Sequence, residues 1–258
     1  MSETIKLIAS DIDGTLLRDG RMDIPPEIFA HIHRLEERGI LFCPASGRQY
    51  KSLRQLFAPV ADKVPFLCEN GAVVYGPGSP GPVWSKTVMD RALAEELSRD
   101  IMARPGVEVL ISGANTSYLC PKGPDFEEHI RWFTGNNICR VPAPEAVPED
   151  IIKVSAYCPE NLEGTRAALV PRWEKRFHAA VAGEAWLDFT LADKGTGLRQ
   201  LCRILNISAG QVMAFGDNFN DAPMLRLVGH PYIMDTAHLQ LREEFSVCSS
   251  VDEILRTL

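Results

Sequence analysis

Short, largely apolar segments that end abruptly in polar residues are the feature that most constrains this chain. Residues 5–9, 40–43 and 212–215 are such runs, and acidic, hydroxyl or glycine residues follow each of them closely. A short strand that is apolar on both faces is typical of a parallel sheet covered by helices on both sides. Ligands bind such sheets at the carboxyl edge of the strands. These segments therefore predict an α/β fold whose functional groups lie along one sheet edge.

Helical periodicity appears between these runs. Ile28, Ile32 and Leu35 recur on one face of a helix that follows two prolines, and Gly39 is a stop signal just past its end. Residues 198, 201, 202 and 205 are apolar at the spacing of a second amphipathic helix. Strands that alternate with helices in this way predict a Rossmann-like parallel sheet with helices on both faces.

The middle of the chain has a different character and predicts a second domain. Strand-like runs mix there with two or three helical stretches, and the simple alternation returns near residue 190. We expect a core domain built from residues 1–80 and 190–258, with an inserted α/β cap domain over residues 81–189. Residues 76–82 are rich in glycine and proline and predict a turn or hinge. Residues 142–148 are expected to form an exposed loop.

Charge and composition exclude several classes of partner. Lys and Arg total 27 against 34 Asp and Glu, a formal charge of −7, which argues against nucleic acid or an anionic membrane as the main partner. No stretch reaches the roughly 18 apolar residues of a membrane helix, and the first residues do not resemble a signal peptide. The seven cysteines contain no Cys-x-x-Cys pair and indicate reduced thiols. We therefore expect a cytoplasmic protein.

Four polar segments occupy the expected sheet edge or the start of a helix. They are residues 11–15 (Asp-Ile-Asp-Gly-Thr), 46–48 (Ser-Gly-Arg), 194–195 (Lys-Gly) and 216–221 (Gly-Asp-Asn-Phe-Asn-Asp). Taken singly, each has an ordinary structural explanation, because such residues commonly form Asx-turns and helix caps. Asp221 in particular could cap the helix that follows it, with or without contacting a metal.

Together, the side chains of these segments favour phosphoryl chemistry. Asp11 and Asp13 can point into one pocket if the chain turns at Gly14, and crowded carboxylates need a hard divalent cation or a lysine to neutralise them. Asp217 and Asp221 add oxygen ligands, and no His/Cys cluster favours zinc. An oxygen-lined pocket with a lysine and a hydroxyl suits a phosphoryl group, which a carboxylate could attack at phosphorus.

In order and spacing, these segments resemble the four motifs of the haloacid dehalogenase superfamily. Asp11-x-Asp13-Gly-Thr-Leu resembles motif one, and residues 46–48, 194–195 and 216–221 resemble motifs two, three and four. The gap of roughly 145 residues between motifs two and three resembles the Cof-like phosphatases (subfamily IIB), which carry a large α/β cap there. Residues 69–72 (Glu-Asn-Gly-Ala) also resemble a short signature before that cap. The resemblance covers roughly residues 5–75 and 188–235.

The resemblance implies roles for the first three motifs. Asp11 would be the nucleophile that forms an aspartyl-phosphate, with its other oxygen on Mg²⁺. Asp13 would be the general acid and then the general base, and its backbone carbonyl would bind the same metal. Ser46 would hydrogen-bond the transferring phosphoryl group, and Lys194 would neutralise negative charge on it and on Asp11. Gly47 is expected beside the substrate.

The same resemblance assigns motif four to the metal and the substrate. Asp217 would be a direct Mg²⁺ ligand, and Asp221 would be a ligand or would orient one. Asn220, together with Arg48 of motif two, would face the phosphate or the rest of the substrate. The chain departs from the family pattern at Asp235, where the family commonly has glycine.

The expected function is Mg²⁺-dependent hydrolysis of small phosphorylated metabolites, with sugar phosphates as the first class to test by analogy with the family. An acid at the position of Asp13 favours phosphoryl transfer over dehalogenation. Two alternatives stay open: a phosphotransferase or phosphomutase with the same aspartyl-phosphate, and a phosphometabolite-binding regulator without turnover. No nucleic acid, membrane or second subunit is required, because a monomer suffices for this chemistry.

Overall fold

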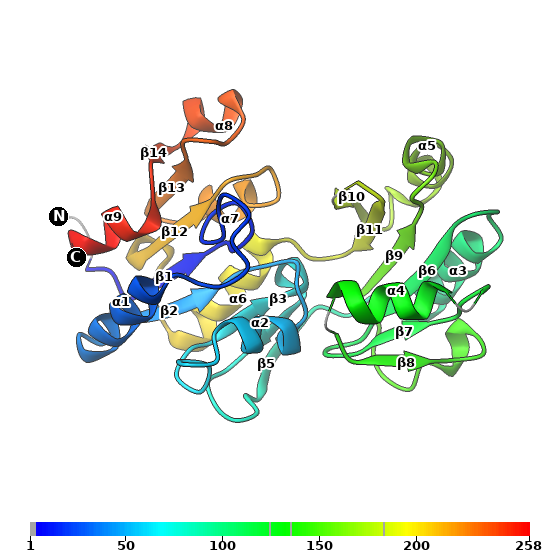
Figure 1. The fold of residues 1–258 in the computed structure, drawn as a ribbon, viewed down its shortest axis with the longest axis horizontal. Coiled ribbons are helices and arrows are strands. Elements are labelled where there is room, and N and C mark those ends of the chain that lie inside the picture. The colour runs from blue at the N-terminus through cyan, green and yellow to red at the C-terminus, as the bar shows by residue number, and fades with distance from the viewer. Residues whose placement is uncertain (1–3, 124, 135, 183) are drawn as a thin grey trace. The chain divides into compact units, whose positions relative to one another are not determined.

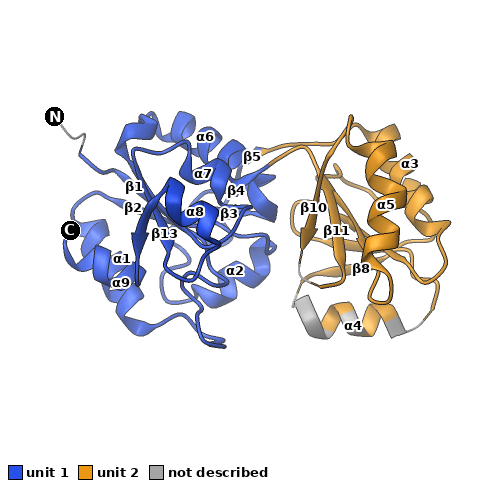
Figure 2. Cartoon of the chain, turned by 90° about the horizontal axis from the view of Figure 1, so that it is seen from above, with its two compact units in different colours: residues 1–85, 193–258 blue, residues 86–192 orange. Residues whose placement is uncertain are grey.

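The computed structural model describes residues 4–123, 125–134, 136–182 and 184–258. The chain divides into two compact units, drawn in separate colours in Figure 2. The core unit contains residues 1–85 and 193–258, and the inserted unit contains residues 86–192. The sequence predicted an insertion over residues 81–189, so the predicted ends lie a few residues before these points.

The core unit is built on a five-stranded sheet in which each pair of neighbouring strands is parallel (Figure 1). Its strand order is β14-β13-β12-β1-β2, which places the first strand of the chain in the middle. The strands are β1 (Leu7–Ser10), β2 (Leu41–Pro44), β12 (Val212–Gly216), β13 (His230–Met234) and β14 (Ser246–Cys248). All residues of β1 and β12 are buried, as their apolar sequences predict. The predicted α/β fold with a parallel core sheet is confirmed.

Helices pack against both faces of this sheet. Leu7 and Ala9 of β1 belong to one apolar cluster with residues of α6, α7 and α8. Phe42 points to the opposite face, where its ring lies 6.3 Å from that of Phe57, which itself lies 6.1 Å from Phe29. The helices of the unit are α1 (Pro26–Glu37), α2 (Tyr50–Leu56), α6 (Lys194–Leu205), α7 (Ala222–Leu225), α8 (Leu239–Glu244) and α9 (Val251–Arg256).

A small second sheet completes the core unit. Its order is β3-β4-β5, from β3 (Phe66–Cys68), β4 (Val73–Tyr75) and β5 (Val83–Lys86), and β3 and β4 run antiparallel. A 3-10 turn, η1 (Glu69–Gly71), joins the first two strands. The segment rich in glycine and proline lies between β4 and β5, where the sequence predicts a turn. A further 3-10 turn, η3 (Ala209–Gln211), leads into β12.

The inserted unit is a six-stranded, mainly antiparallel sheet of order β10-β11-β9-β6-β7-β8. Helices α3 and α5 share an apolar cluster with one of its faces. Phe126 and Ile130 of α4 pack on Leu110 and Leu119, which belong to the opposite face. The strands are β6 (Glu108–Ser112), β7 (Ser117–Leu119), β8 (Ile138–Arg140), β9 (Lys153–Tyr157), β10 (His178–Ala182) and β11 (Trp186–Thr190). The helices are α3 (Arg91–Met102), α4 (Asp125–Thr134) and α5 (Leu162–Trp173).

The expectation of an exposed loop over residues 142–148 is wrong in part. This segment contains a 3-10 turn, η2 (Pro144–Ala146), and the side chains of Pro144 and Val147 are buried. Val147 belongs to the main apolar cluster of the inserted unit. The guanidinium of Arg91 on α3 donates to the backbone carbonyl of Val147 at 2.7 Å, which holds the segment against the helix.

Candidate active site

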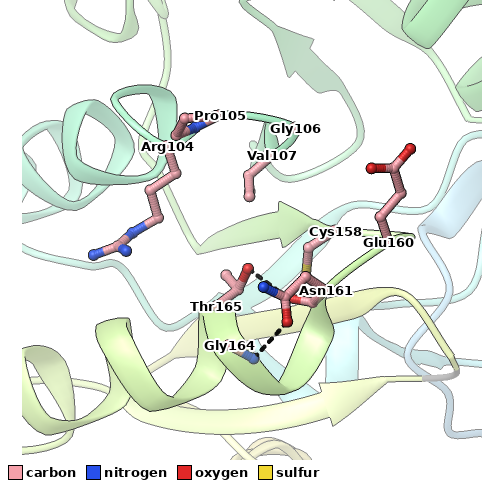
Figure 3. Close-up of a pocket in the computed structure, with 9 residues that line it drawn as sticks. All are labelled: Arg104, Pro105, Gly106, Val107, Cys158, Glu160, Asn161, Gly164 and Thr165. Atoms are coloured by element: carbon pink, nitrogen blue, oxygen red, sulfur yellow. Dashed lines mark hydrogen bonds between the residues drawn. The ribbon is translucent and has the colours of Figure 1, made fainter.

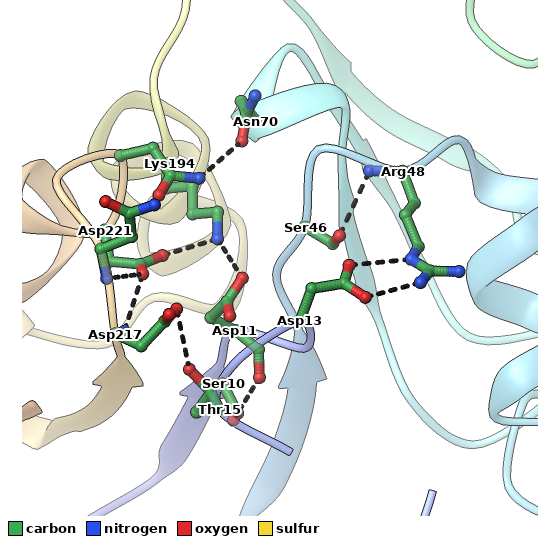
Figure 4. A network of polar contacts seen from close by, with 12 residues as sticks. Ser10, Asp11, Asp13, Thr15, Ser46, Arg48, Asn70, Lys194, Asp217 and Asp221 are labelled. Carbon is green, nitrogen blue, oxygen red and sulfur yellow. Dashed lines mark hydrogen bonds and ion pairs between the residues drawn. The ribbon is translucent and has the colours of Figure 1, made fainter. Parts of the chain in front are cut away.

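The four predicted motifs converge at the carboxyl edge of the core sheet. Asp11 directly follows β1, Ser46 lies two residues past β2, and Asp217 directly follows β12. Because these strands are neighbours and parallel, their carboxyl ends lie side by side. Lys194 is the first residue of α6, and its ammonium reaches the same edge (Figure 4).

A buried lysine joins two of the acidic motifs. Lys194 is fully buried, and its Nζ donates to Asp11 Oδ1 at 2.5 Å and to Asp221 Oδ1 at 2.6 Å. Asp221 is also fully buried, and Asp11 is 5% exposed. A buried charge is tolerated only when it is paired. The two carboxylates thus hold the ammonium in one place at the centre of the site.

The site carries more negative charge than one lysine can balance. Burial raises the pKa of Asp11 to about 8 from its ordinary value of 3.8; Lys194 opposes this rise and Asp221 adds to it. Burial also raises the pKa of Asp217. For Lys194, burial disfavours the charged form, but Asp11 and Asp221 outweigh burial and raise its pKa. Without a further cation, the excess carboxylate charge is relieved by binding a proton.

Asp221 is held by the backbone of its own motif as well as by the lysine. Its Oδ2 accepts the backbone N–H groups of Asp217 and Asn218, both at 3.0 Å. Gly216 makes this turn possible, because a Cβ there would lie 2.4 Å from the Cβ of Asp221. Both oxygens of Asp221 therefore have protein donors, and its carboxylate fixes the loop that carries Asp217.

Asp217 lies against the motif-one loop. Gly14 has a φ of +92°, and a Cβ at this position would fall 2.2 Å from Asp217 Oδ2. The hydroxyl of Thr15 donates to Asp217 Oδ1 at 3.4 Å. Glycine is required here by its backbone conformation and by this close approach. The conformation brings the loop carrying Asp11 next to the loop carrying Asp217.

The acidic cluster fits a hard divalent cation. Asp11, Asp217 and Asp221 each offer an oxygen within 4.8 Å of the others. Asp11 Oδ2 is buried, and no hydrogen-bond donor among the described residues reaches it. Several carboxylate oxygens, one of them buried without a donor, form the kind of ligand set that Mg²⁺ takes. Burial is the main cause that raises the pKa values of Asp11 and Asp217, and the neighbouring carboxylate of Asp221 raises both further.

Asp13 does not join this cluster, although it is only two residues from Asp11. Arg48 donates through Nε to Asp13 Oδ2 at 2.9 Å and through Nη2 to Asp13 Oδ1 at 2.6 Å. This hydrogen bond is also the main cause that raises the pKa of Arg48. Figure 4 shows the carboxylate of Asp13 turned toward Arg48, on the other side of the loop from Lys194.

Asn70 connects motifs two and four and was not among the predicted site residues. Its backbone N–H donates to the carbonyl of Ser46 at 2.9 Å, and its side-chain Oδ1 lies 3.4 Å from Asn220 Nδ2. A Cβ at Gly47 would lie 3.2 Å from Asn70 Nδ2. Asn70 has a φ of +52°, a conformation that asparagine tolerates better than most residues. The Asn-Gly pair was the available signal for a functional turn.

Asp235, which departs from the family pattern, lies outside the acidic cluster. Its Oδ1 accepts from Arg18 Nη2 at 2.8 Å, and the same guanidinium reaches the backbone carbonyl of Ser249. Arg18 follows the motif-one loop. The additional carboxylate is therefore balanced locally and ties this segment to the end of β13.

A separate cavity of about 220 Å³ lies in the inserted unit (Figure 3). Asn161 Oδ1 accepts the backbone N–H of Gly164 at 2.9 Å, and the Thr165 hydroxyl donates to the Asn161 carbonyl at 2.8 Å. These contacts cap the start of α5, which forms part of the cavity wall. None of the predicted site residues lines it. The lining residues are Arg104, Pro105, Gly106, Val107, Cys158, Glu160, Asn161, Gly164 and Thr165.

Comparison with known proteins decides the family. A model of haloacid dehalogenase-like hydrolases matches residues 8–251. The chain belongs to this family. The resemblance drawn from the four motifs is therefore confirmed, and so is the expectation that the chain is a hydrolase. Within the part of this hydrolase that the structure describes, no helix is long and apolar enough to cross a membrane.

Individual relatives of this haloacid dehalogenase-like hydrolase include named phosphatases. It is 28% identical over 244 residues to 5-amino-6-(5-phospho-D-ribitylamino)uracil phosphatase YbjI of Escherichia coli, an alignment covering 91% of this chain and 86% of that protein. It is 28% identical over 247 residues to HMP-PP phosphatase of Serratia proteamaculans, covering 92% and 86%. A crystal structure of a Eubacterium rectale protein matches with a TM-score of 0.89 and 30% identity, covering 98% of each chain.

Proposed function

We propose that this hydrolase is a Mg²⁺-dependent phosphatase of small phosphorylated metabolites that works through an aspartyl-phosphate on Asp11. One observation carries the proposal: buried Lys194 bridges Asp11 and Asp221, while Asp11 Oδ2 has no donor among the described residues. A carboxylate oriented by an ammonium, with its second oxygen beside other carboxylates, suits attack on a phosphoryl group whose charge is shared with a cation.

We assign the cation to Asp11, Asp217 and the backbone carbonyl of Asp13, with Asp221 beside them. Asp221 orients the cluster because both of its oxygens already accept protein hydrogen bonds. When bound, Mg²⁺ supplies positive charge that counters the crowded carboxylates and the phosphoryl oxygens. The raised pKa values of Asp11 and Asp217 are consistent with this assignment: burial raises both, and a cation would counter the repulsion from Asp221 that adds to the rise.

The first chemical step forms the aspartyl-phosphate. The carboxylate of Asp11 forms a bond to phosphorus as the bond from phosphorus to the leaving oxygen breaks. Asp13 gives its proton to that oxygen, so the leaving group departs as a neutral alcohol. Lys194 balances negative charge on Asp11 and on the phosphoryl group. The Ser46 hydroxyl accepts from the backbone N–H of Arg48 at 3.2 Å, which leaves its own proton free to donate to a phosphoryl oxygen.

The second step returns the enzyme to its starting state. Water attacks phosphorus and gives a proton to Asp13, while the bond between phosphorus and Asp11 breaks. The products are inorganic phosphate and the ionised carboxylate of Asp11. Asp13 thus donates a proton in the first step and recovers one in the second, which requires a carboxyl group that can reach the side of phosphorus opposite Asp11.

For the substrate, we propose sugar phosphates and related phosphomonoesters of small metabolites. The relative in Escherichia coli is named for a substrate with a phosphorylated ribityl chain, and the relative in Serratia for HMP-PP. Both names describe small phosphorylated compounds. We further propose that the inserted unit, residues 86–192, is the cap domain whose residues select the leaving group.

The test is phosphate release from a panel that contains sugar phosphates, sugar-alcohol phosphates and pyrimidine phosphates. The wild type is assayed with Mg²⁺ and with EDTA, beside Asp11→Asn and Asp235→Asn. Asp235 is a matched control because it lies at the same sheet edge and pairs with Arg18 outside the cluster. We expect Mg²⁺-dependent release that Asp11→Asn loses and Asp235→Asn keeps.

Two outcomes would contradict the proposal. Release that persists in Asp11→Asn would mean that another group attacks phosphorus. Transfer of the phosphoryl group to an added sugar in preference to water would favour a phosphotransferase with the same intermediate.

A further inference from the structure

Arg48 and Asp13 form an ion pair with two parallel hydrogen bonds, a more specific geometry than that of a chance surface contact. Each carboxylate oxygen of Asp13 accepts from a different nitrogen of Arg48, at 2.6 and 2.9 Å. Such a two-point contact fixes the plane of the carboxylate as well as its position. The ammonium of a lysine would contact the carboxylate at one point and leave its plane free to rotate. The two-point contact with Arg48 instead restricts the carboxylate of Asp13 to a single orientation.

The backbone on both sides of this pair is anchored. The N–H of Gly14 donates to the carbonyl of Leu17 at 2.9 Å, closing the turn that carries Asp13. The N–H of Arg48 donates to the Ser46 hydroxyl at 3.2 Å, and the carbonyl of Arg48 accepts from the N–H of Glu69 at 3.1 Å. With both loops fixed, rotation of the Asp13 side chain is its main remaining freedom, and Arg48 controls that rotation.

The location of Asp13 also separates it from the nucleophile. Asp11 is buried and directed at Lys194, whereas the side chain of Asp13 is 55% exposed and directed at Arg48. The pair uses two of the lone-pair sites on the carboxylate, and each oxygen keeps another for a proton or a substrate hydroxyl. Asp13 is thus held clear of the acidic cluster while its exposed side stays accessible.

We infer that Arg48 is a positioning residue that acts through Asp13: its two-point contact holds the carboxyl group where it exchanges a proton with the leaving group. This inference rests on the proposed phosphatase function and on the acid–base role of Asp13 within it. It differs from the expectation that Arg48 faces the phosphate. The two hypotheses are distinguishable, because they predict that the effect of an Arg48 substitution on kcat depends differently on the leaving group.

Two substrates separate these readings. The p-nitrophenolate group leaves as a stabilised anion and needs little help from an acid, whereas the benzyl alkoxide of benzyl phosphate needs a proton as it leaves. If Arg48 acts through Asp13, Arg48→Ala lowers kcat on benzyl phosphate by at least about tenfold and on p-nitrophenyl phosphate by less than about threefold. Arg48→Lys falls between the wild type and Arg48→Ala.

The pathway through Asp13 is tested by combining variants. In an Asp13→Asn background, Arg48→Ala should cause no further loss of kcat on benzyl phosphate, because the group it positions is already absent. Arg226→Ala is the matched control: Arg226 makes the same two-point contact with Glu244, at 2.6 and 2.9 Å, and neither residue belongs to the four motifs. It should change neither kcat nor the ratio between the two substrates.

Each other outcome overturns the inference. Equal losses on both substrates, or losses that multiply with those of Asp13→Asn, would mean that Arg48 contacts the phosphate directly. Unchanged kcat on both would mean that the pair is only a surface contact. Should Arg48→Ala fail to fold, Arg48→Lys and Arg48→Gln give the same comparison. Absence of phosphate release by the wild type from every substrate would instead refute the proposed function.

Discussion

At the scale of single residues, the site depends on carboxylates whose surroundings give them different tasks. Asp11 has one oxygen on Lys194 and one without a donor among the described residues. Asp221 has both oxygens engaged by protein donors, and Asp13 has both on Arg48. Asp217 accepts a long hydrogen bond of 3.4 Å from the hydroxyl of Thr15. The contacts thus differ among chemically equal side chains, and the proposed roles of attack, support, proton exchange and metal binding follow these differences.

Asp217 should control the affinity for Mg²⁺. We expect Asp217→Ala to raise the Mg²⁺ concentration for half-maximal phosphate release by at least about tenfold, because the cluster loses a carboxylate that the hydroxyl of Thr15 contacts only at 3.4 Å. Titration of activity with Mg²⁺ measures this. Asp235→Ala serves as the control, since its carboxylate pairs with Arg18. An unchanged Mg²⁺ requirement in Asp217→Ala would remove this residue from the metal site.

Asp221 should matter most for stability. Asp221→Ala leaves the fully buried ammonium of Lys194 with one partner fewer, and breaking a buried ion pair costs about 3–5 kcal/mol. The free energy of unfolding from urea denaturation tests this. Asp221→Ala combined with Lys194→Met should recover much of the loss, because no buried charge remains unpaired. Failure of the double variant to recover would show that the loop contacts of Asp221 dominate.

At the scale of elements, the start of α6 depends on close backbone packing against η1. Gly71 has a φ of +92°, and a Cβ there would lie 2.2 Å from the carbonyl oxygen of Asp193, the N-cap residue of α6. A Cβ at Gly197, one turn into the helix, would lie 2.6 Å from the Cα of Gly71. Two glycines thus bring the turn after β3 against the helix that begins with Lys194.

Replacing Gly71 should therefore disturb both stability and catalysis. We expect Gly71→Ala to cost at least about 3 kcal/mol, from backbone strain and from the clash with Asp193 together. Gly106→Ala is the control, because Gly106 has a φ of +69° but, among the described residues other than its two chain neighbours, no atom lies within 4 Å of a Cβ there, and strain alone costs about 1–2 kcal/mol. Urea denaturation and kcat are measured for both. Equal losses of stability would mean that packing against α6 contributes nothing.

Many of the helices and strands could be predicted from the sequence, for identifiable reasons. The apolar run before Asp11 predicted β1, and the periodicity from Leu198 to Leu205 predicted α6, because burial on a regular element leaves a regular pattern. The pairs between Arg48 and Asp13 and between Arg18 and Asp235 could not be predicted. These pairs join residues that lie 35 and 217 positions apart, and they form only when the side chains rotate toward each other from fixed loops. The local sequence pattern contains no information on the distant partner or on the rotation.

At the scale of the whole molecule, the buried carboxylates of the site couple stability to pH. Burial raises the pKa of Asp11 to about 8, above the 3.8 of an ordinary aspartate. Between these values the folded chain holds a proton that the unfolded chain releases, so the metal-free protein loses stability as pH rises from about 5 to about 8. Mg²⁺ bound as proposed would favour the ionised carboxylates and oppose this loss.

We therefore expect the Tm of metal-free protein to fall over this range, and Mg²⁺ to raise Tm more at about pH 8 than at about pH 5. Thermal unfolding with EDTA and with Mg²⁺ at both pH values tests this. Asp11→Asn should flatten the dependence on pH, because an amide does not titrate. A Tm that rises with pH in the wild type with EDTA would contradict the assignment.

The division of the core unit between two stretches of chain has a consequence for the order in which the protein is made. β1 lies between β2 and β12, and residues 86–192 separate the two stretches. During translation, every strand of the inserted unit leaves the ribosome before residue 212, so that unit can fold first as a continuous segment. β1 meanwhile lacks its second neighbour, and Asp11 lacks Lys194 and Asp217. The motifs of the proposed active site therefore cannot come together in a nascent chain before residue 221 has been synthesised, and until β12 is made the central strand β1 keeps one edge unpaired.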